Sequence, residues 1–475
     1  MRRRAGTAPF ADAHDLLTAM RDGAQTPATI VEEAIARIQV ADRALNAVIH
    51  PRFDSARQEA SQVKSGLPFA GMPMLVKDAL CATRGDPYHF GMRVLRDAGW
   101  CSPRDSHLAR RFRRAGFVIL GRTNTPELAG SYTTEPVAYG PTRNPWDLSR
   151  SPGGSSGGSA ASVAAGFVPV AHGNDTGGSI RVPASMCGVV GIKPTRASIS
   201  LGPEFGEFRG FLTCEGVLTR SVRDAAAVLR QISGGATGDP YRPPAWRPRP
   251  TAQQAPPRLR IGVVTRPPGG REPVHAACAA AADRVASALD RLGHRVATAQ
   301  VPAFAEAAYE QHLHTLVAVG MLRDLDRWSE RLGRPIGQAD VEPWTWEFAS
   351  KARSVSAARY IASVESLQDA CWDINTWWRT HIDILVTPAV PVPAPTLGFV
   401  DRAECDVGVF ARPFNVSGQP AISIPAGYSE EGLPVGIQLV AATGKDGLLL
   451  QVAEQAEAVI GRAEPPDLVT ITAAS

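Results

Sequence analysis

Long apolar runs are missing from this sequence. The longest, residues 160–171, contains Gly166 and Pro169 and is shorter than the roughly 20 apolar residues that a membrane-spanning helix needs. Three arginines stand at positions 2–4, but residues 5–15 do not supply the apolar segment that follows such a cluster in an export signal. We therefore expect a cytoplasmic protein with no membrane segment.

A large excess of one charge is also missing. The 50 basic and 46 acidic residues give a net charge of +4, and the basic residues are spread along the chain instead of forming one stripe. Nucleic-acid-binding proteins usually gather positive charge on one face. The sequence therefore gives no reason to expect nucleic acid as a partner.

Cysteine is scarce, and its pattern is not that of a disulfide or zinc protein. The seven cysteines include no Cys-x-x-Cys pair, and none has histidine partners at the spacing of a zinc site. We expect free, buried thiols that pack as small hydrophobic side chains. Cys187 and Cys214 lie near the candidate chemistry described below, where they are candidates to line a pocket.

The composition that remains is that of an ordinary folded protein, with 44% hydrophobic and 20% charged residues. At 475 residues the chain exceeds the size at which a single core stops growing, so we expect one large α/β domain with insertions or two domains. Thr26 followed by Pro27 is typical of a helix start. Short apolar runs then alternate with helical stretches, which predicts an α/β fold. The predicted strands are residues 74–76, 117–120, 168–171, 189–192, 259–264, 382–386 and 421–425.

Glycine and proline divide the chain into regions. The stretch 151–159 is too rich in glycine for a regular element and leads into the helix-forming residues 160–165. The stretch 234–257 is rich in Pro, Gly and Arg, which indicates a surface linker. We therefore expect an N-terminal helical region at 1–65, a core with the candidate catalytic residues at 66–232, a linker and variable helical insertion at 233–380, and a C-terminal return to the core sheet at 381–475.

The turn at residues 175–181 has the features of a catalytic nucleophile. Two glycines directly precede Ser179, and glycine lets the backbone turn so that successive N–H groups point at one place. Such N–H groups can hold the oxyanion that forms when a hydroxyl attacks a carbonyl. Ser179 supplies the hydroxyl, which is a weak nucleophile without a base. The predicted oxyanion donors are the N–H groups of Thr176, Gly177, Gly178 and Ser179.

A lysine is the best candidate for the base. His172 lies in a strand-like run, and His89 and His107 stand in no triad context. The turn is not the Gly-x-Ser-x-Gly elbow of α/β-hydrolases, because Arg181 occupies the place of the second glycine. Lys77 ends a buried strand candidate, where desolvation disfavours the charged amine, and a neutral amine can accept a proton.

Several motifs together resemble the amidase signature family. They are Gly71-Met72-Pro73 with Lys77-Asp78, the loop at 152–159, and the turn at 175–181 with Pro183-Ala184. The likeness continues through residues 121–124, 188–195 and 415–438, whereas residues 234–380 look individual. It implies an α/β fold in which a mixed central β-sheet is sandwiched by α-helices, with a smaller variable helical insertion.

The resemblance also implies the roles at the site. It makes Ser179 the nucleophile, Ser155 a serine preceded by a cis peptide bond, and Lys77 the base acting through Ser155. The spacing agrees, because the family's bridging serine precedes the nucleophile by 24 residues and 179 − 155 = 24. The residues expected to orient the loop and brace the turn are Ser156, Asp175 and Arg181.

The expected activity is that of an amidase acting on linear carbon–nitrogen amide bonds of a small or medium acyl group, with ester bonds as secondary substrates. The reaction passes through an acyl-enzyme and needs no metal or organic cofactor. Three other functions stay open: an acyltransferase or amide-forming enzyme, the glutaminase subunit of a tRNA-dependent amidotransferase, and a scaffold that has kept only the fold. The resemblance also allows a homodimer.

The remaining conspicuous residues are less specific. Glu204 and Glu207 lie near the expected pocket mouth, where residues 196–209 depart from the family pattern, and either could hold an amine acceptor. His172 shows no partner pattern and is expected to be structural. Tryptophans that can line a pocket or fill a helical core are Trp344, Trp346, Trp372, Trp377 and Trp378.

Overall fold

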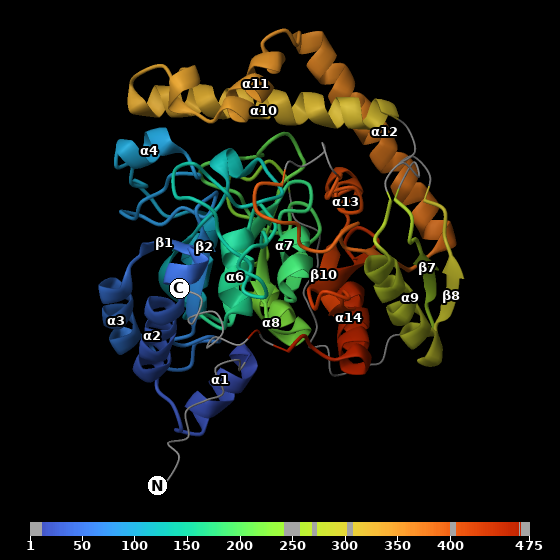
Figure 1. The fold of residues 1–475 in the computed structure, drawn as a ribbon, viewed down its shortest axis with the longest axis horizontal. Helices are drawn as coiled ribbons and strands as arrows, with labels where there is room; N and C mark the ends of the chain where they lie inside the picture. Colours follow the sequence, from blue (N-terminus) through green and yellow to red (C-terminus); the bar gives the residue numbers. More distant parts are fainter. Residues whose placement is uncertain are drawn as a thin grey trace.

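One mixed sheet of eleven strands forms the centre of the molecule (Figure 1). The computed structural model describes residues 12–241, 257–267, 273–301, 307–399, 405–464 and 466. The strand order is β1-β3-β2-β4-β6-β5-β10-β11-β9-β7-β8. The pairs β3/β2, β2/β4, β9/β7 and β7/β8 are parallel and the others antiparallel. The strands are β1 (Val48–Pro51), β2 (Pro73–Lys77), β3 (Val118–Thr123), β4 (Val170–Asp175), β5 (Val190–Lys193), β6 (Cys214–Thr219), β7 (Arg260–Val263), β8 (Arg295–Thr298), β9 (Ile384–Pro388), β10 (Ala421–Tyr428) and β11 (Pro434–Ala441).

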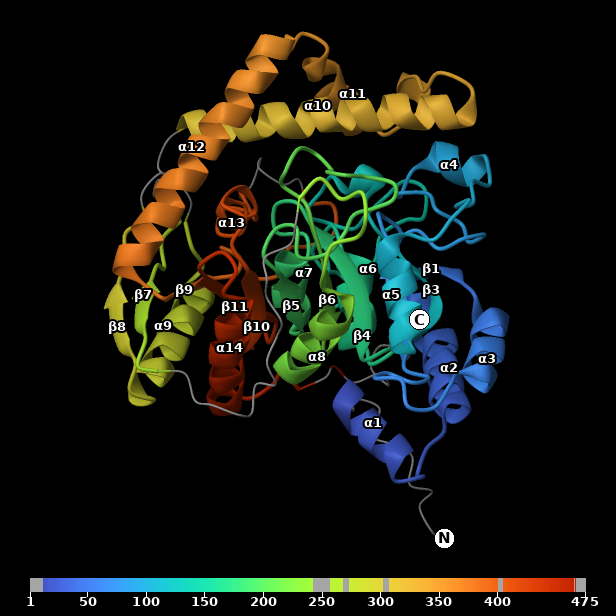
Figure 2. The same ribbon diagram turned by 180° about the vertical axis from the view of Figure 1, so that it is seen from behind.

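Helices cover both faces of this sheet (Figures 1 and 2). Successive residues of a strand point to opposite faces. Met74 and Val76 of β2 therefore share a core with α5, α8, α9 and α14, whereas Leu75 shares the other core with α2, α3, α6 and α7. This sandwich confirms the predicted fold class. The helices are α1 (Ala13–Arg21), α2 (Pro27–Leu45), α3 (Phe53–Gln62), α4 (Arg93–Asp97), α5 (His107–Ala115), α6 (Gly157–Ala164), α7 (Arg181–Cys187), α8 (Val222–Ile232), α9 (Ala276–Arg291), α10 (Ala307–Leu332), α11 (Pro343–Ala352), α12 (Ala357–His381), α13 (Pro413–Val416) and α14 (Asp446–Ile460).

Two helix starts illustrate how local sequence determines the elements. Helix α2 begins as predicted, with Thr26 as N-cap and Pro27 in the first turn. Helix α6 begins at Gly157, inside the stretch expected to be irregular. Glycine is tolerated there because of close packing: a Cβ on Gly158 would lie 2.6 Å from Asn124 N. The close approach, and not flexibility, explains these glycines.

The segment 233–380 contributes more than helices. Strands β7 and β8, with α9 between them, extend the central sheet beside β9. Helices α10 and α11 then lie across the top of Figure 1, and α12 descends from there toward β8. Ile374 and Trp378 of α12 pack in one cluster with Leu385 of β9. On α10, Trp328 packs against Tyr88 and Phe90, with ring centroids 6.0 and 5.7 Å apart. Most of the expected surface linker, residues 242–256, lies outside the described residues. In the ranges that are described, no helix is long and apolar enough to cross a membrane.

Candidate active site

Lys77 lies at the carboxyl end of β2, and its side chain is fully buried. Its Nζ donates hydrogen bonds to Ser155 Oγ at 2.7 Å and to Asn174 Oδ1 at 2.8 Å. Burial lowers the pKa of Lys77 to about 7, because the negative charges of Glu215 and Asp175 only partly offset the loss of solvation. A substantial fraction of this amine is therefore neutral near pH 7.

Ser155 lies in the glycine-rich loop that leads into α6. The peptide bond between Gly154 and Ser155 is cis, as the resemblance implied. Thr125 Oγ1 donates to Ser155 O at 3.0 Å, and a Cβ on Gly154 would lie 2.4 Å from Thr133 O. Bonds and close packing therefore hold the loop where the Ser155 hydroxyl meets Lys77.

Ser179 lies on the turn between β4 and α7. Ser156 N donates to Ser179 O at 3.1 Å, which joins this turn to the glycine-rich loop. Ser179 is 7% exposed, against 1% for Ser155. Within the described residues, no hydrogen bond links the Ser179 hydroxyl to Ser155 Oγ. The structure thus brings Lys77 and Ser155 into contact and places Ser179, the more accessible serine, on the adjoining turn.

A buried ion pair underlies this turn. Arg181 Nε and Nη2 donate to the Asp175 carboxylate at 2.9 and 2.8 Å. Arg181 also donates to Asn415 Oδ1 and Gln438 Oε1, each at 2.6 Å. Burial alone would raise the pKa of Asp175, but the charge and hydrogen bonds of Arg181 outweigh burial and hold this pKa well below its usual range. The pair links the turn to the C-terminal part of the sheet.

The N–H groups predicted to hold an oxyanion are not equivalent. Gly178 N donates to Asp175 Oδ1 at 2.7 Å, so this donor is already used. The N–H groups of Thr176, Gly177 and Ser179 have no acceptor among the residues that the structure describes. The set available to an oxyanion is therefore smaller than the sequence predicted, because the glycine before the serine serves the ion pair.

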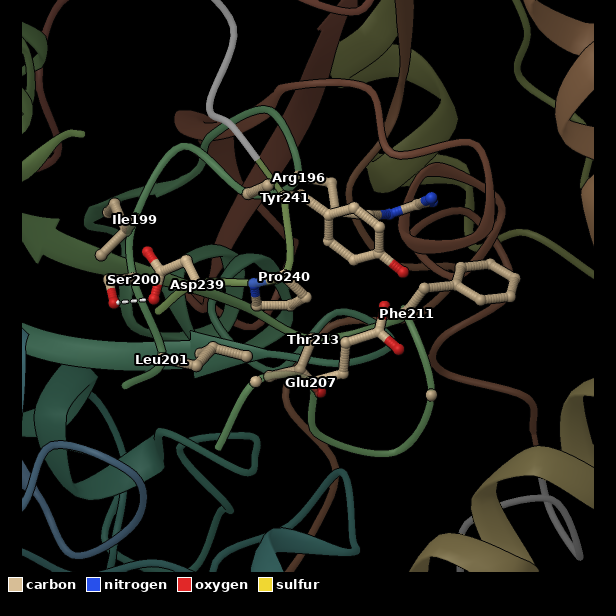
Figure 3. Close-up of a pocket in the computed structure, with 13 residues that line it drawn as sticks. Arg196, Ile199, Ser200, Leu201, Glu207, Phe211, Thr213, Asp239, Pro240 and Tyr241 are labelled. Atoms are coloured by element: carbon tan, nitrogen blue, oxygen red, sulfur yellow. Dashed lines mark hydrogen bonds between the residues drawn. The ribbon is translucent and has the colours of Figure 1, made fainter. Parts of the chain in front are cut away.

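A small cavity of about 40 Å³ is lined by residues from the segments 196–213 and 239–241 (Figure 3). Thr213 lines it and contacts the turn directly, since its Oγ1 lies 2.8 Å from Thr176 Oγ1. Glu207 also lines the cavity. Glu204 does not line the cavity. Its carboxylate accepts a hydrogen bond from Arg331 of α10 at 2.5 Å. Of the two glutamates singled out from the sequence, only Glu207 is placed to meet a ligand there.

The other candidates for pocket residues lie elsewhere. Cys187 and Cys214 are buried but do not line the cavity. None of the five tryptophans lines it either. Trp378 is buried in a hydrophobic cluster with Phe414, and Trp372 is 76% exposed. The interpretation of the tryptophans as packing residues fits Trp378.

One group of described side chains has the ligand types of a metal site. His50, Asp78 and His89 offer ligand atoms within 4.8 Å of one another. Tyr139 OH already joins the two imidazoles, at 3.2 Å from His50 Nε2 and hydrogen-bonded to His89 Nδ1. Burial and the charge of Arg122, 3.9 Å from Asp78, lower the pKa of both histidines. A cation would meet the same repulsion, so we interpret the group as a hydrogen-bond network.

Residues around Lys77 were missed by the sequence reasoning. Asn174 accepts a hydrogen bond from the amine, and His172, expected to be structural, touches Glu215 and the backbone of Lys77. The period of two along β4 would have placed His172 and Asn174 on one face of the sheet. Glu215 carried no such signal, because it lies on β6, a strand that was not predicted.

Comparisons with known proteins agree with this geometry. The Amidase family model matches residues 29–450. The 6-aminohexanoate-cyclic-dimer hydrolase of Paenarthrobacter ureafaciens is 42% identical over 461 residues, which cover 93% of each chain. A solved structure of a 6-aminohexanoate cyclic dimer hydrolase with its substrate has a TM-score of 0.93 at 40% identity, covering 98% of this chain and all of that one. The solved structure of a glutamyl-tRNA(Gln) amidotransferase component from Thermotoga maritima has a TM-score of 0.78 at 28% identity, covering 97% of this chain and 98% of that one.

Proposed function

The chain belongs to the amidase signature family of hydrolases, and from this membership we propose that it cleaves an amide bond with Ser179 as nucleophile, Lys77 as base and Ser155 as the link between them. The observation that carries the proposal is the 2.7 Å contact between Lys77 Nζ and Ser155 Oγ. The buried amine of Lys77 contacts Ser155, and the loop that carries Ser155 is hydrogen-bonded to the Ser179 turn. These groups are the components of a proton relay.

The protonation state of Lys77 determines the direction of the relay. A neutral amine has two N–H groups and one lone pair. With one N–H donated to Asn174 Oδ1, the lone pair can accept the Ser155 proton while Ser155 Oγ accepts that of Ser179. This step also requires contact between the two serine hydroxyls, for which no hydrogen bond is found among the described residues.

Attack by Ser179 Oγ on the amide carbon forms a tetrahedral oxyanion. The N–H groups of Thr176, Gly177 and Ser179 are the candidates to hold it, and Asp175 orients the turn through the Gly178 N–H. The relay then returns the proton to the leaving nitrogen as the carbon–nitrogen bond breaks. Water, deprotonated by the same relay, hydrolyses the acyl-enzyme and releases the carboxylic acid.

The substrate class in this proposal is wider than the linear amides expected from the sequence. The relative from Paenarthrobacter ureafaciens is named for hydrolysis of a cyclic dimer of 6-aminohexanoate. A cyclic carboxamide has no charged termini, so its recognition depends on shape and on the amide itself. We propose that the chain accepts cyclic as well as linear secondary amides, with ester bonds as secondary substrates.

The test is intact-protein mass spectrometry during turnover of a panel containing the cyclic 6-aminohexanoate dimer, linear acyl amides, glutamine and esters. The wild type should carry the acyl mass, and Ser179→Ala should not. Ser162→Ala is the matched control, because among the described residues this buried hydroxyl bonds to Gly158 O, within its own helix. An adduct that persists in Ser179→Ala would refute the assignment. Transfer to an added amine in preference to water, or turnover of glutamine alone, would favour the acyltransferase or the glutaminase.

A further inference from the structure

A histidine and a glutamate form a buried pair beneath the candidate base. His172 Nε2 lies 2.9 Å from Glu215 Oε2, and both residues are at most 2% exposed. On its other side, His172 Nδ1 lies 3.3 Å from Lys77 N. The imidazole therefore connects the carboxylate to the backbone from which the base extends.

The sheet explains why a side chain takes this backbone N–H. The ladder between β2 and β4 is limited to Met74 with Val170 and Leu75 with Ala171. Beyond these pairs, His172 supplies the acceptor that a strand would otherwise offer to Lys77. A ring nitrogen that accepts from an N–H carries no proton, so the ring proton is on Nε2, where Glu215 accepts it. The two contacts thus fix both the tautomer and the orientation of the ring.

The charged groups around Lys77 differ in whether another ion already pairs with them. Asp175 is neutralised by Arg181 in the buried ion pair. Arg209 opposes protonation of the amine and itself lies 3.6 Å from Asp324. Glu215 is the cross-strand partner of Asn174, which accepts a hydrogen bond from the amine, so the two side chains lie on the same face of the sheet. The charge of Glu215 favours protonation of the amine, and its partner in the described structure is His172.

Other polar groups near Lys77 are occupied elsewhere. Arg122 donates to Lys77 O at 3.1 Å and lies 3.9 Å from Asp78. The Asp78 carboxylate accepts from His89 N, so it serves the loop that follows β2. Asn174, on β4, is uncharged. Glu215 is therefore the carboxylate whose role at the base is not explained by another ion pair.

We propose that Glu215 and His172 form a positioning unit for the base: His172 fixes the end of β2 from which Lys77 extends, and Glu215, paired across the strands with Asn174, supplies a negative charge on the face of the sheet where the amine lies. The inference rests on the proposed function, because it gives the pair a role only if Lys77 is the base. Without this charge the buried amine would hold its proton less strongly and would be a weaker base.

The test uses Glu215→Gln, which keeps an acceptor for His172 and removes only the charge. The chain contains five lysines, at positions 64, 77, 193, 351 and 445, so NMR of ¹³Cε-lysine gives few signals, and the one missing in Lys77→Arg identifies Lys77. We expect Glu215→Gln to lower the midpoint of the Lys77 titration by roughly one to two pH units, the scale of one charge about 6–12 Å away at an effective dielectric near 20. The acid limb of kcat/KM should move by the same amount.

Glu457→Gln is the matched control, because Glu457 is also a buried glutamate but bonds to Val222 N at the start of α8. It should leave the titration of Lys77 unchanged. Glu215→Asp keeps the charge but withdraws it by one methylene, so it should lower the midpoint of the Lys77 titration by less than Glu215→Gln does. If Glu215→Gln does not fold, the shift in Glu215→Asp tests the inference.

A folded Glu215→Gln that is less active but titrates Lys77 like the wild type would overturn the inference and leave Glu215 as a packing residue. That result would not affect the proposed function, which depends on acylation of Ser179 in the wild type. Conversely, a wild type that is not acylated at Ser179 would refute the proposed function whatever the titration shows.

Discussion

Asp175→Asn removes one charge from the Ser179 turn with almost no change of shape. The carboxylate accepts from Gly178 N at 2.7 Å and Ile180 N at 3.1 Å, and it is the counterion of the buried Arg181. The amide would turn an NH₂ group toward one of these donors and leave the Arg181 charge unpaired. Breaking a buried pair by removing one partner costs about 3–5 kcal/mol. We expect Asp175→Asn to lose about this much unfolding free energy, together with most of its amidase activity.

Urea unfolding followed by circular dichroism measures the loss, and Asp383→Asn is the control. Asp383 also accepts from both arms of an arginine, at 3.0 and 3.3 Å from Arg260, but the two side chains are 31% and 42% exposed. An exposed pair contributes only about 0–1 kcal/mol. Similar losses in the two variants would refute the reasoning that burial makes the Asp175 pair essential.

The pH dependence gives an independent check on the same variant. The folded-state pKa of Asp175 lies below its ordinary value of 3.8, so the stability that its charge contributes is complete above about pH 4 and is lost as the pH falls below that value. The difference in unfolding free energy between wild type and Asp175→Asn should therefore be constant from pH 5 to 8 and shrink in acid. A difference that already falls between pH 8 and 5 would mean that another group is responsible.

Ser155→Ala should slow acylation by roughly 10²- to 10⁴-fold, the range of general acid–base catalysis, and Ser156→Ala should slow it less. Adduct formation followed by mass spectrometry measures both rates, and equal rates in the two variants would contradict the relay. The neutral form of Lys77 is the active one in this mechanism, and burial lowers its pKa to about 7. The ratio kcat/KM should therefore rise about tenfold per pH unit below pH 7 and level off above it. A flat profile would exclude a lysine base. Gly158→Ala would place Cβ 2.6 Å from a backbone nitrogen and should lower the melting temperature, whereas Gly337→Ala, whose nearest contact would be 3.8 Å, should not.

The strands found from the sequence share one property. All seven predicted runs overlap strands of the sheet, and most of these strands are buried on both faces, so they read as continuous apolar segments. Strands β1 and β8 are short edge strands with partly exposed residues, and they carry no such run. Strands β6 and β11 contain polar or glycine residues within the buried ladder, such as Glu215 and Gln438. These residues interrupt the apolar pattern, and each bonds to a side chain of the candidate site: Glu215 to His172 and Gln438 to Arg181.

The loops of the site were predictable for a different reason. The glycines before Ser155 and Ser179 are needed for local turns and close approaches, and both needs are visible within a few neighbouring residues. The partners of these loops are not local. Arg181 binds residues more than 200 positions away, Asn415 and Gln438, and only the folded sheet brings them together. The sequence could therefore indicate the candidate reacting residues and the local pair of Asp175 and Arg181, but not the distant residues that hold this pair.

Residues outside the two loops also affect how strongly the base, Lys77, holds its proton. Burial removes solvent from Lys77 and favours the neutral amine, yet an amine that is never protonated could not return a proton to the leaving group. The opposing effect comes from carboxylates on neighbouring strands, and its largest part is that of Glu215. In the proposed mechanism the glycine-rich loop and the Ser179 turn supply the reacting groups, whereas the charge of Glu215 on β6, outside both, adjusts how strongly the amine holds its proton. The pH at which the chain is active should therefore depend on the β6 position more than on the loops themselves.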